Sequence, residues 1–223
     1  MTGNIAMLQL VAKGLGHLKE DVIFVGGCVT ELYALNPELS DIRATQDVDC
    51  IIEISSYMHL GDLEEELRKL KFSHDTSEGA PICRWIFSDI KVDIMPTLSD
   101  VIGFSNRWYS DGIKNKIENV LPDGTSIYIL SPEYYLATKF EAHRGRGGDD
   151  LRTSHDFEDI IYIIDNNDNI CEIIRKCTNP ELEKYLKEQC VLLINNDNII
   201  ESIGCMLPIG SQEIGRASCR ERV

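Results

Sequence analysis

The sequence predicts an α/β protein of the α+β type, with a mixed β-sheet flanked by helices and a helical C-terminal part. Short apolar segments typical of strands alternate with amphipathic helical segments through the first 130 residues. Beyond residue 130 the periodicity is helical, and no repeat or linker interrupts the chain. We expect residues 1–130 to form the sheet-containing core and 131–212 a helical subdomain packed on it. Residues 213–223 are suddenly rich in arginine, which predicts a vector-derived tail.

The composition is that of an ordinary globular protein, with 43% hydrophobic and 26% charged residues. No apolar run approaches the roughly 20 residues that a membrane span needs, and the N-terminus lacks the pattern of a signal peptide. We therefore expect a cytoplasmic protein with no membrane partner. The eight cysteines form no C-x-x-C pair, which disfavours a zinc ribbon or a redox motif. A formal charge of −15 disfavours a broad basic face for nucleic acid.

Apolar spacing and capping signals place the helices and strands in order. Asn36-Pro37 ends the helix that follows the first strand, Ser88-Asp89 joins two strands as a hairpin, and Ser131-Pro-Glu133 opens a helix. Residues 99–126 read as mostly loop, and Asn-rich turns follow residue 164. The helices are predicted at 4–19, 29–35, 60–72, 133–143, 157–164, 180–194 and 199–206, and the strands at 22–25, 47–54, 82–87, 90–95 and 125–130.

Two aspartates mark the start of the strand at 47–54. Side chains alternate along a strand, so Asp47 and Asp49 project from the same face. Two carboxylates this close repel each other unless a cation lies between them or one of them stays protonated. An oxygen-seeking divalent ion such as Mg²⁺ resolves the repulsion. The alternative is a pair of solvated acids at the strand's start.

A Gly-Gly turn connects the first strand to the helix that follows it. Glycine lets backbone N–H groups approach an anion closely, and a helix N-terminus favours negative charge. Gly26 and Gly27 are therefore candidates for a phosphate cradle. In the alternative, these glycines only let the helix pack closely on the sheet.

A third acid lies on the second strand of the predicted hairpin. Asp93 is embedded between apolar neighbours, where a carboxylate needs a partner. Two partners are open: Arg84 across the hairpin, or a site shared with Asp47 and Asp49.

The combination of Gly26-Gly27, Asp47-x-Asp49 and Asp93 resembles the DNA polymerase β-type nucleotidyltransferase superfamily. More specifically, the chain is similar to the AbiEii/AbiGii toxin-type nucleotidyltransferases between about residues 20 and 165. Cys28 stands where a serine often follows the glycines. The matching segments are Phe24-Val-Gly-Gly, Arg43-Ala-Thr-Gln-Asp-Val-Asp, Val92-Asp-Ile-Met-Pro, Gly103-Phe-Ser-Asn-Arg-Trp-Tyr109, Leu136-Ala-Thr-Lys-Phe-Glu-Ala142 and Ser154-His-Asp-Phe-Glu-Asp-Ile-Ile161.

The resemblance implies an enzyme that moves a nucleoside monophosphate from an NTP such as ATP to a hydroxyl-type acceptor. It implies two Mg²⁺ ions, with Mn²⁺ as a substitute, held by Asp47, Asp49 and Asp93, which are also the catalytic residues. It assigns nucleotide binding to the residues Gly26, Gly27, Arg43, Thr45, Lys139, Asp156 and Asp159. It further implies a toxin of a toxin–antitoxin or phage-defence pair, with an antitoxin protein as partner and RNA such as tRNA as one acceptor.

Several of these assignments have a structural alternative. Lys139 is either a phosphate ligand or a surface lysine, and Asp156 is either a site acid or a helix cap. Arg43 and Thr45 either position the metal-binding strand or reach phosphate, and the alternative for Arg43 is an ion pair with Glu38 or Asp41. A basic cluster either contacts triphosphate or RNA or is a solvated helix end. That cluster consists of His143, Arg144, Arg146 and Arg152.

Two other functions are compatible with the sequence. The first is a nucleotidyltransferase whose acceptor is a small molecule or a protein side chain. The negative charge of the chain favours such an acceptor over a long RNA. The second is a non-catalytic nucleotide-binding protein of the same fold.

Overall fold

The computed structural model describes residues 1–37, 41–54, 56–97, 106–146 and 150–207. The chain divides into two compact units. The first, here called the sheet unit, comprises residues 1–29 and 43–131, and the second, the helical unit, comprises residues 30–42 and the chain from residue 132 onward.

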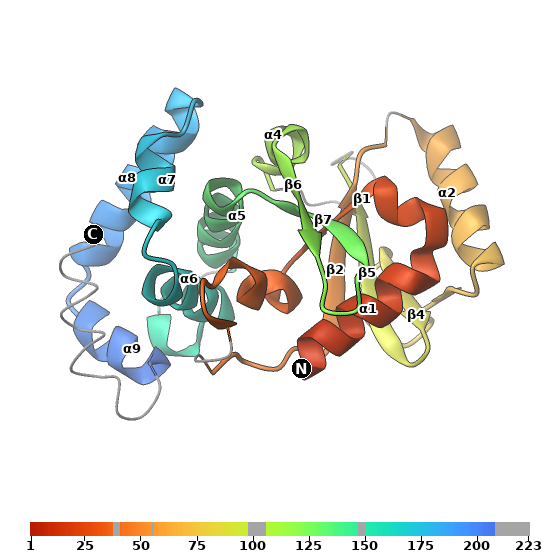
Figure 1. Cartoon of the computed structure of the whole chain (residues 1–223), viewed down its shortest axis with the longest axis horizontal. Helices are drawn as coiled ribbons and strands as arrows, with labels where there is room; N and C mark the ends of the chain where they lie inside the picture. The colour runs from red at the N-terminus through yellow and green to blue at the C-terminus, as the bar shows by residue number, and fades with distance from the viewer. Residues whose placement is uncertain (38–40, 55, 98–105, 147–149, 208–223) are drawn as a thin grey trace. The chain divides into compact units, whose positions relative to one another are not determined.

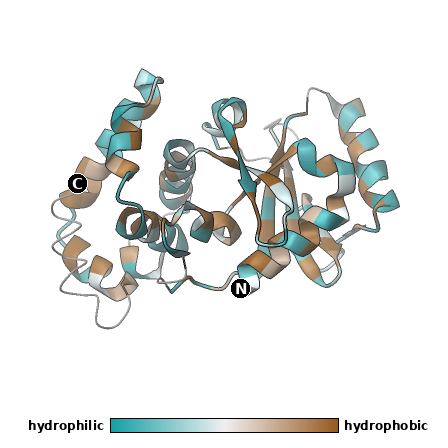
Figure 2. Cartoon of the chain, in the orientation of Figure 1, coloured by the Kyte–Doolittle hydropathy of each residue, from teal (hydrophilic) through white to brown (hydrophobic). Residues whose placement is uncertain are grey.

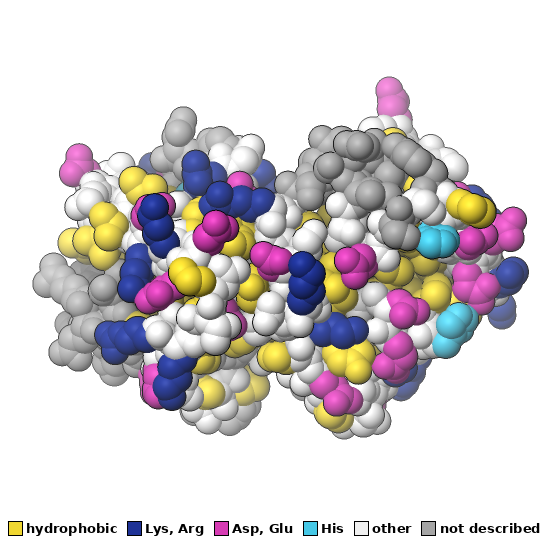
Figure 3. Space-filling view, turned by 90° about the horizontal axis from the view of Figure 1, so that it is seen from above, with side chains coloured by type: hydrophobic (Ala, Val, Ile, Leu, Met, Phe, Trp, Pro, Cys, Tyr) yellow, Lys and Arg dark blue, Asp and Glu magenta, His cyan; other side chains and the backbone are white. Residues whose placement is uncertain are grey.

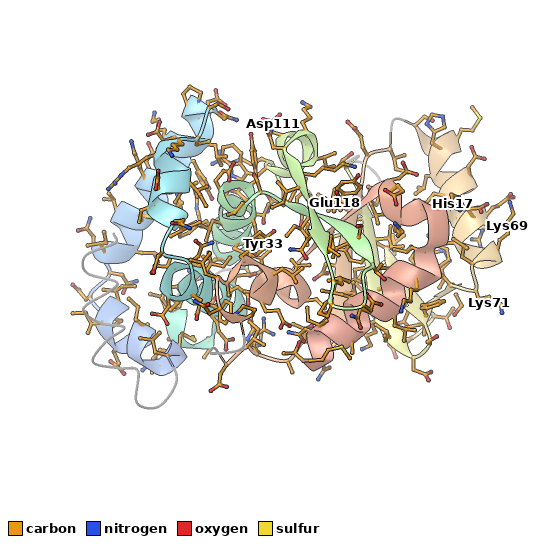
Figure 4. All side chains as sticks on the ribbon, viewed as in Figure 1. His17, Tyr33, Lys69, Lys71, Asp111 and Glu118 are labelled. Carbon is orange, nitrogen blue, oxygen red and sulfur yellow. The ribbon has the colours of Figure 1, made fainter. Side chains whose placement is uncertain are left out.

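Residues 30–42 thus belong to the helical unit, although the sequence placed them with the sheet. Side-chain contacts with the later helices explain this. Tyr33, labelled in Figure 4, stacks on Tyr135 with ring centroids 4.5 Å apart. The hydroxyls of Thr30 and Tyr135 lie 2.7 Å apart, and Asn167 donates to the Tyr33 carbonyl. Such long-range contacts leave no periodic trace in the sequence.

The sheet unit is built on a mixed seven-stranded sheet within the described residues, in the order β3-β4-β5-β2-β1-β7-β6 (Figure 1). β1 is antiparallel to β2, and β2 is parallel to β5. The mixed α/β fold predicted from the sequence is confirmed. The strands are β1 (Val22–Val25), β2 (Asp47–Ile52), β3 (Ser73–His74), β4 (Arg84–Phe87), β5 (Ile90–Pro96), β6 (Lys116–Val120) and β7 (Ser126–Leu130).

The hairpin of β4 and β5 closes as the sequence predicts. Ser88 and Asp89 both have positive φ, at 48° and 65°, as a two-residue type I′ turn requires. The antiparallel register that follows places Arg84 opposite Asp93 and Trp85 opposite Val92. The two faces of the hairpin therefore differ, because Trp85 and Val92 are buried and apolar and the other face carries the charges.

Helices α1 (Gly3–Leu15) and α2 (Tyr57–Lys69) belong to the sheet unit. Both are amphipathic, with hydrophobic and hydrophilic residues on different sides (Figure 2). A Cβ added to Gly14 would lie 2.4 Å from the ring of Phe87, so α1 packs closely on β4. Short 3₁₀ helices follow α1 and β1: η1 (Gly16–Glu20) and η2 (Gly27–Tyr33).

The helical unit contains five α-helices among its described residues. Ser154 caps α6 by accepting from the Phe157 amide, and Asn179 caps α8, which has proline at its first turn. Leu151, Phe157, Ile161 and Leu207 form a small apolar core in this unit. The helices are α5 (Pro132–Gly145), α6 (His155–Asn166), α7 (Ile170–Arg175), α8 (Pro180–Ile194) and α9 (Ile199–Met206), with the 3₁₀ turn η4 (Leu151–Thr153).

Three local predictions are corrected. Residues 99–126 contain α4 (Tyr109–Lys114) and β6 rather than loop alone; β6 is an edge strand with polar residues on both faces, so it lacks the apolar alternation. The Asn-rich stretch contains the short helix α7, and the helix expected at 29–35 is the 3₁₀ helix η2. The tail predicted at 213–223 lies outside the described residues.

Within the ranges given above, no helix is both long enough and apolar enough to cross a bilayer.

Candidate functional site

The parallel pairing of β2 and β5 brings the three predicted acids together. Asp49 is the register partner of Asp93, and Asp47 lies two residues earlier on the same side of β2. Asp93 is buried, whereas the Asp47 side chain is 38% exposed. Carboxylates from two neighbouring strands therefore share one face, and solvent reaches it at Asp47.

Arg84 forms a bidentate ion pair with the innermost of these acids. Its Nε donates to Oδ1 of Asp93 and its Nη2 to Oδ2, both at 2.7 Å. The same Nη2 lies 3.7 Å from Oδ2 of Asp47. Both partners that the sequence left open for Asp93 are thus present together.

These contacts fix the charge state of the arginine. Hydrogen bonding to Asp93, together with the nearby Asp47 and Asp49, raises the pKa of the Arg84 guanidinium above its ordinary value. A bidentate charged pair of this kind is strong and geometrically specific. The sequence indicates Arg84 only as an alternative partner of Asp93, and the structure makes it part of the site.

The Gly-Gly turn approaches the acid strand closely at Gly26. This residue has φ of +72°, and a Cβ placed on it would lie 1.8 Å from Oδ2 of Asp49. No side chain fits there unless the Asp49 carboxylate moves. Gly26 is therefore required by both its backbone conformation and its contact with the acid.

The residues after Gly26 are held by α1. Gly27 begins η2, and the buried Cys28 donates its thiol to the backbone carbonyl of Asn4 at 3.4 Å. The Cys28 side chain therefore points into the sheet unit, at the position where the resembling family often has a serine.

Asn4 also fixes the lead-in to β2. Its amide nitrogen donates to the Arg43 carbonyl, and its Oδ1 accepts from the Thr45 amide, both at 3.0 Å. The Thr45 hydroxyl donates in turn to the Asp47 carbonyl at 3.3 Å. Asn4 is only 2% exposed. Sequence reasoning missed it, since the one available signal was a polar residue at the start of an amphipathic helix.

Thr45 and Arg43 both had a structural role as an alternative to nucleotide binding. For Thr45, the hydroxyl contact with the Asp47 carbonyl shows that it positions the backbone. For Arg43, the predicted partner Glu38 lies outside the described residues.

The donor set of the site suits a hard divalent ion such as Mg²⁺. The acids supply carboxylate oxygens, which Mg²⁺ prefers. Burial raises the pKa of the neighbouring Cys50 thiol well above its ordinary value and that of Cys83 to about 11, so both stay protonated and poor ligands for soft metals. In the part of the chain that the structure describes, no three His, Cys, Asp or Glu side chains are arranged to hold a metal ion. Asp47 and Asp49 supply carboxylates on one side of β2, and Asp93 and Asp47 both lie close to the Arg84 guanidinium.

Lys139 of α5 lies in a buried ion-pair cluster of the helical unit. Its Nζ is 3.3 Å from Asp156 and 2.5 Å from Asp159, two acids of α6. All three residues are buried. The alternative of a surface lysine is wrong. The alternative of Asp156 as a helix cap is also wrong, because Ser154 caps α6.

Two arginines of the predicted basic cluster are paired with acids. Arg146 lies 2.8 Å from Asp156, and Arg152 makes a bidentate pair with Asp150 and a further contact with Glu201. His143 Nδ1 is 2.7 Å from the Ser154 hydroxyl, and partial burial lowers the pKa of this histidine below its ordinary 6.5.

The molecular surface shows the same mixing of charges. On the face shown in Figure 3, Asp and Glu side chains of the described residues lie among the Lys and Arg side chains.

Part of one predicted motif is described. Residues 103–105 lie outside the described ranges, and Trp108 is buried with its amide donating to Asn106.

Comparison with known proteins supports the fold class. No protein-family model matches the chain, and no curated protein matches it. Among solved structures, the chain has the fold of a nucleotidyltransferase-like protein. One match is the crystal structure of an antigenic nucleotidyltransferase-like protein from Paracoccidioides brasiliensis, with a TM-score of 0.54 and 17% sequence identity. It covers 93% of this chain and 95% of the other. At this identity the likeness shows the fold alone.

Proposed function

We propose that the protein is a Mg²⁺-dependent nucleotidyltransferase that moves a nucleoside monophosphate from an NTP to a hydroxyl-type acceptor. The observation that carries this proposal is the placement of Asp49 beside Asp93 on parallel strands, with the Asp49 carboxylate against Gly26. This placement brings the two acid-bearing strands, β2 and β5, and the Gly-Gly turn together at one site. The nucleotidyltransferase-like fold of the solved structure supports it.

In the proposed reaction, the acceptor oxygen forms a bond to the α-phosphorus of the NTP. The bond from that phosphorus to the oxygen bridging to the β-phosphorus breaks, and pyrophosphate leaves. Asp93 accepts the hydroxyl proton. Asp47, Asp49 and Asp93 would hold two Mg²⁺ ions, with Mn²⁺ as a substitute. Bound Mg²⁺ supplies the positive charge that orients the triphosphate and stabilises the transition state.

The remaining nucleotide contacts are proposed from the sequence resemblance. Gly26 and Gly27 would present backbone N–H groups to the triphosphate, with Arg43 and Thr45 beside them. Lys139, with Asp156 and Asp159, is the weaker assignment, because its charge is already neutralised by two buried acids.

The acceptor and the biological role are proposed at a coarser level. The resemblance favours a cytoplasmic toxin with an antitoxin partner and an RNA such as tRNA as acceptor. The pairing of Arg146 and Arg152 with acids and the charge of −15 favour a small molecule or a protein side chain instead.

One observation favours a second candidate, a non-catalytic nucleotide-binding protein of the same fold. Arg84 neutralises Asp93 through a bidentate ion pair. In a binding protein this pair would persist when nucleotide is bound.

Transfer of label from α-³²P NTPs separates the candidates. Wild type and Asp47→Ala/Asp49→Ala would each be incubated with Mg²⁺ and with total RNA, protein or a metabolite extract. We expect label on one carrier with the wild type only, and the labelled carrier identifies the acceptor class. Nucleotide binding without label on any carrier would support the binding protein.

A further inference from the structure

The Arg84 guanidinium lies close to two of the acids that the proposed function assigns to Mg²⁺. It contacts both oxygens of Asp93 at 2.7 Å and reaches to 3.7 Å from Asp47. These are two of the three carboxylates proposed to hold Mg²⁺. A divalent cation held by the same carboxylates would repel the positively charged guanidinium.

The pair also meets a need of the protein without metal. Asp93 is buried, and a buried carboxylate without a partner is costly. Lys91, the register partner of Asp47, is exposed, and the cation that pairs with Asp93 is Arg84. The Arg84 side chain is 19% exposed, so its guanidinium has a route to solvent.

We propose that Arg84 is an internal counter-ion that competes with the metal for Asp93 and Asp47, and that metal binding requires it to leave. Arg84 is thus a positioning residue: it holds the acids in place in the metal-free protein and weakens the affinity for free Mg²⁺. This inference rests on the proposed function, because that function places the metal at these acids.

Calorimetric titration of the nucleotide-free protein with Mg²⁺ tests this competition. Arg84→Gln removes the competing charge, so we expect its Kd for Mg²⁺ to fall at least about tenfold below that of the wild type. Arg84→Lys keeps the charge but loses the bidentate geometry, and we expect an intermediate Kd. Melting temperature is a second readout: Arg84→Gln melts lower than the wild type without metal and gains more on addition of Mg²⁺.

Arg152→Gln is a matched control in the helical unit. Arg152 makes the same bidentate contact, Nε to Oδ1 and Nη2 to Oδ2 of Asp150, at 2.9 and 3.0 Å on the exposed surface. Its Kd for Mg²⁺ should equal that of the wild type. Adding Asp47→Ala to Arg84→Gln should abolish the tight binding.

The outcomes distinguish this inference from the function on which it rests. Equal or weaker Mg²⁺ binding by Arg84→Gln and Arg84→Lys would overturn the competition and leave the metal site standing. Absence of Mg²⁺ binding in the wild type and both variants would overturn the inference and the metal-dependent function together. Arg84→Lys keeps the test decisive if Arg84→Gln does not fold.

Discussion

At the scale of single residues, the absence of a side chain at Gly26 leaves the space that the Asp49 carboxylate occupies. A side chain at this position would meet both an unfavourable positive φ and the Asp49 carboxylate. Gly124, in the turn between β6 and β7, has φ of +83° but open space around the position of a Cβ. An alanine at Gly124 therefore measures the cost of the backbone conformation alone, whereas an alanine at Gly26 adds the cost of the contact with Asp49.

We predict that Gly26→Ala destabilises the protein by roughly 2–5 kcal/mol, as the sum of a left-handed backbone and an overpacked contact. Gly124→Ala should cost about 1–2 kcal/mol, from the backbone alone. Urea denaturation measures both. Gly26→Ala should also weaken Mg²⁺ binding because Asp49 is displaced. Equal costs for the two variants would show that the contact with Asp49 is unimportant.

At the scale of secondary-structure elements, a buried cluster of charges joins α5 to α6. Lys139 holds Asp156 and Asp159, while Asp156 also contacts Arg146, whose side chain is 73% exposed. Asp156 thus pairs with one buried cation, Lys139, and one exposed cation, Arg146. Breaking a buried ion pair lowers the free energy of unfolding much more than breaking an exposed one.

We predict that Lys139→Met costs about 3–5 kcal/mol, since it removes the buried cation that Asp156 and Asp159 share. Arg146→Gln, which removes an exposed partner of the same acid, should cost at most about 1 kcal/mol. Chemical denaturation at neutral pH compares them. A similar small cost for both would contradict the structural role of Lys139, and a loss of NTP affinity without loss of stability would assign it to the nucleotide instead.

The contact between the end of α5 and the start of α6 gives a pH dependence. The pKa of His143 is lower in the folded protein than its ordinary 6.5, so the folded state binds fewer protons. The contribution of neutral His143 to the free energy of unfolding is therefore fully present above about pH 6.5 and is lost as the pH falls through the pKa of the folded state.

We expect the free energy of unfolding to decrease between pH 7 and pH 5, and His143→Asn to flatten that dependence. Exposed His59→Asn serves as the control and should leave it unchanged. The acids whose pKa values are lowered, Asp75, Asp123 and Asp150, start from 3.8 and act below this window. A pH dependence that is the same in His143→Asn and the wild type would contradict this assignment.

At the scale of the whole molecule, the fold class and most elements could be predicted because they depend on local patterns. The strands β1, β4 and β5 and the helices α8 and α9 follow apolar spacing, turn residues and caps. The strand β6 could not be predicted, because its pairing with β7 is set by the turn between them rather than by its own polar sequence.

The site shows the same division. Asp47 and Asp49 share a face by strand alternation alone, so the sequence was sufficient for them. The register of β2 on β5 joins residues 44 apart in the chain, and only the fold shows that Asp93 faces Asp49. The roles of Asn4 and of the Arg84 bridge depend on three-dimensional contacts that no spacing in the sequence encodes.

The measurement that tests the central claim most directly compares α-³²P and γ-³²P ATP as donors with Mg²⁺ and the acceptor found in the labelling experiment. The proposed reaction transfers the α-phosphorus and releases the γ-phosphorus within pyrophosphate. It predicts acceptor label from the α-labelled donor only, and none with Asp47→Ala/Asp49→Ala. Label from the γ-labelled donor, or α-label that persists in the double variant, would contradict nucleotidyl transfer at these carboxylates.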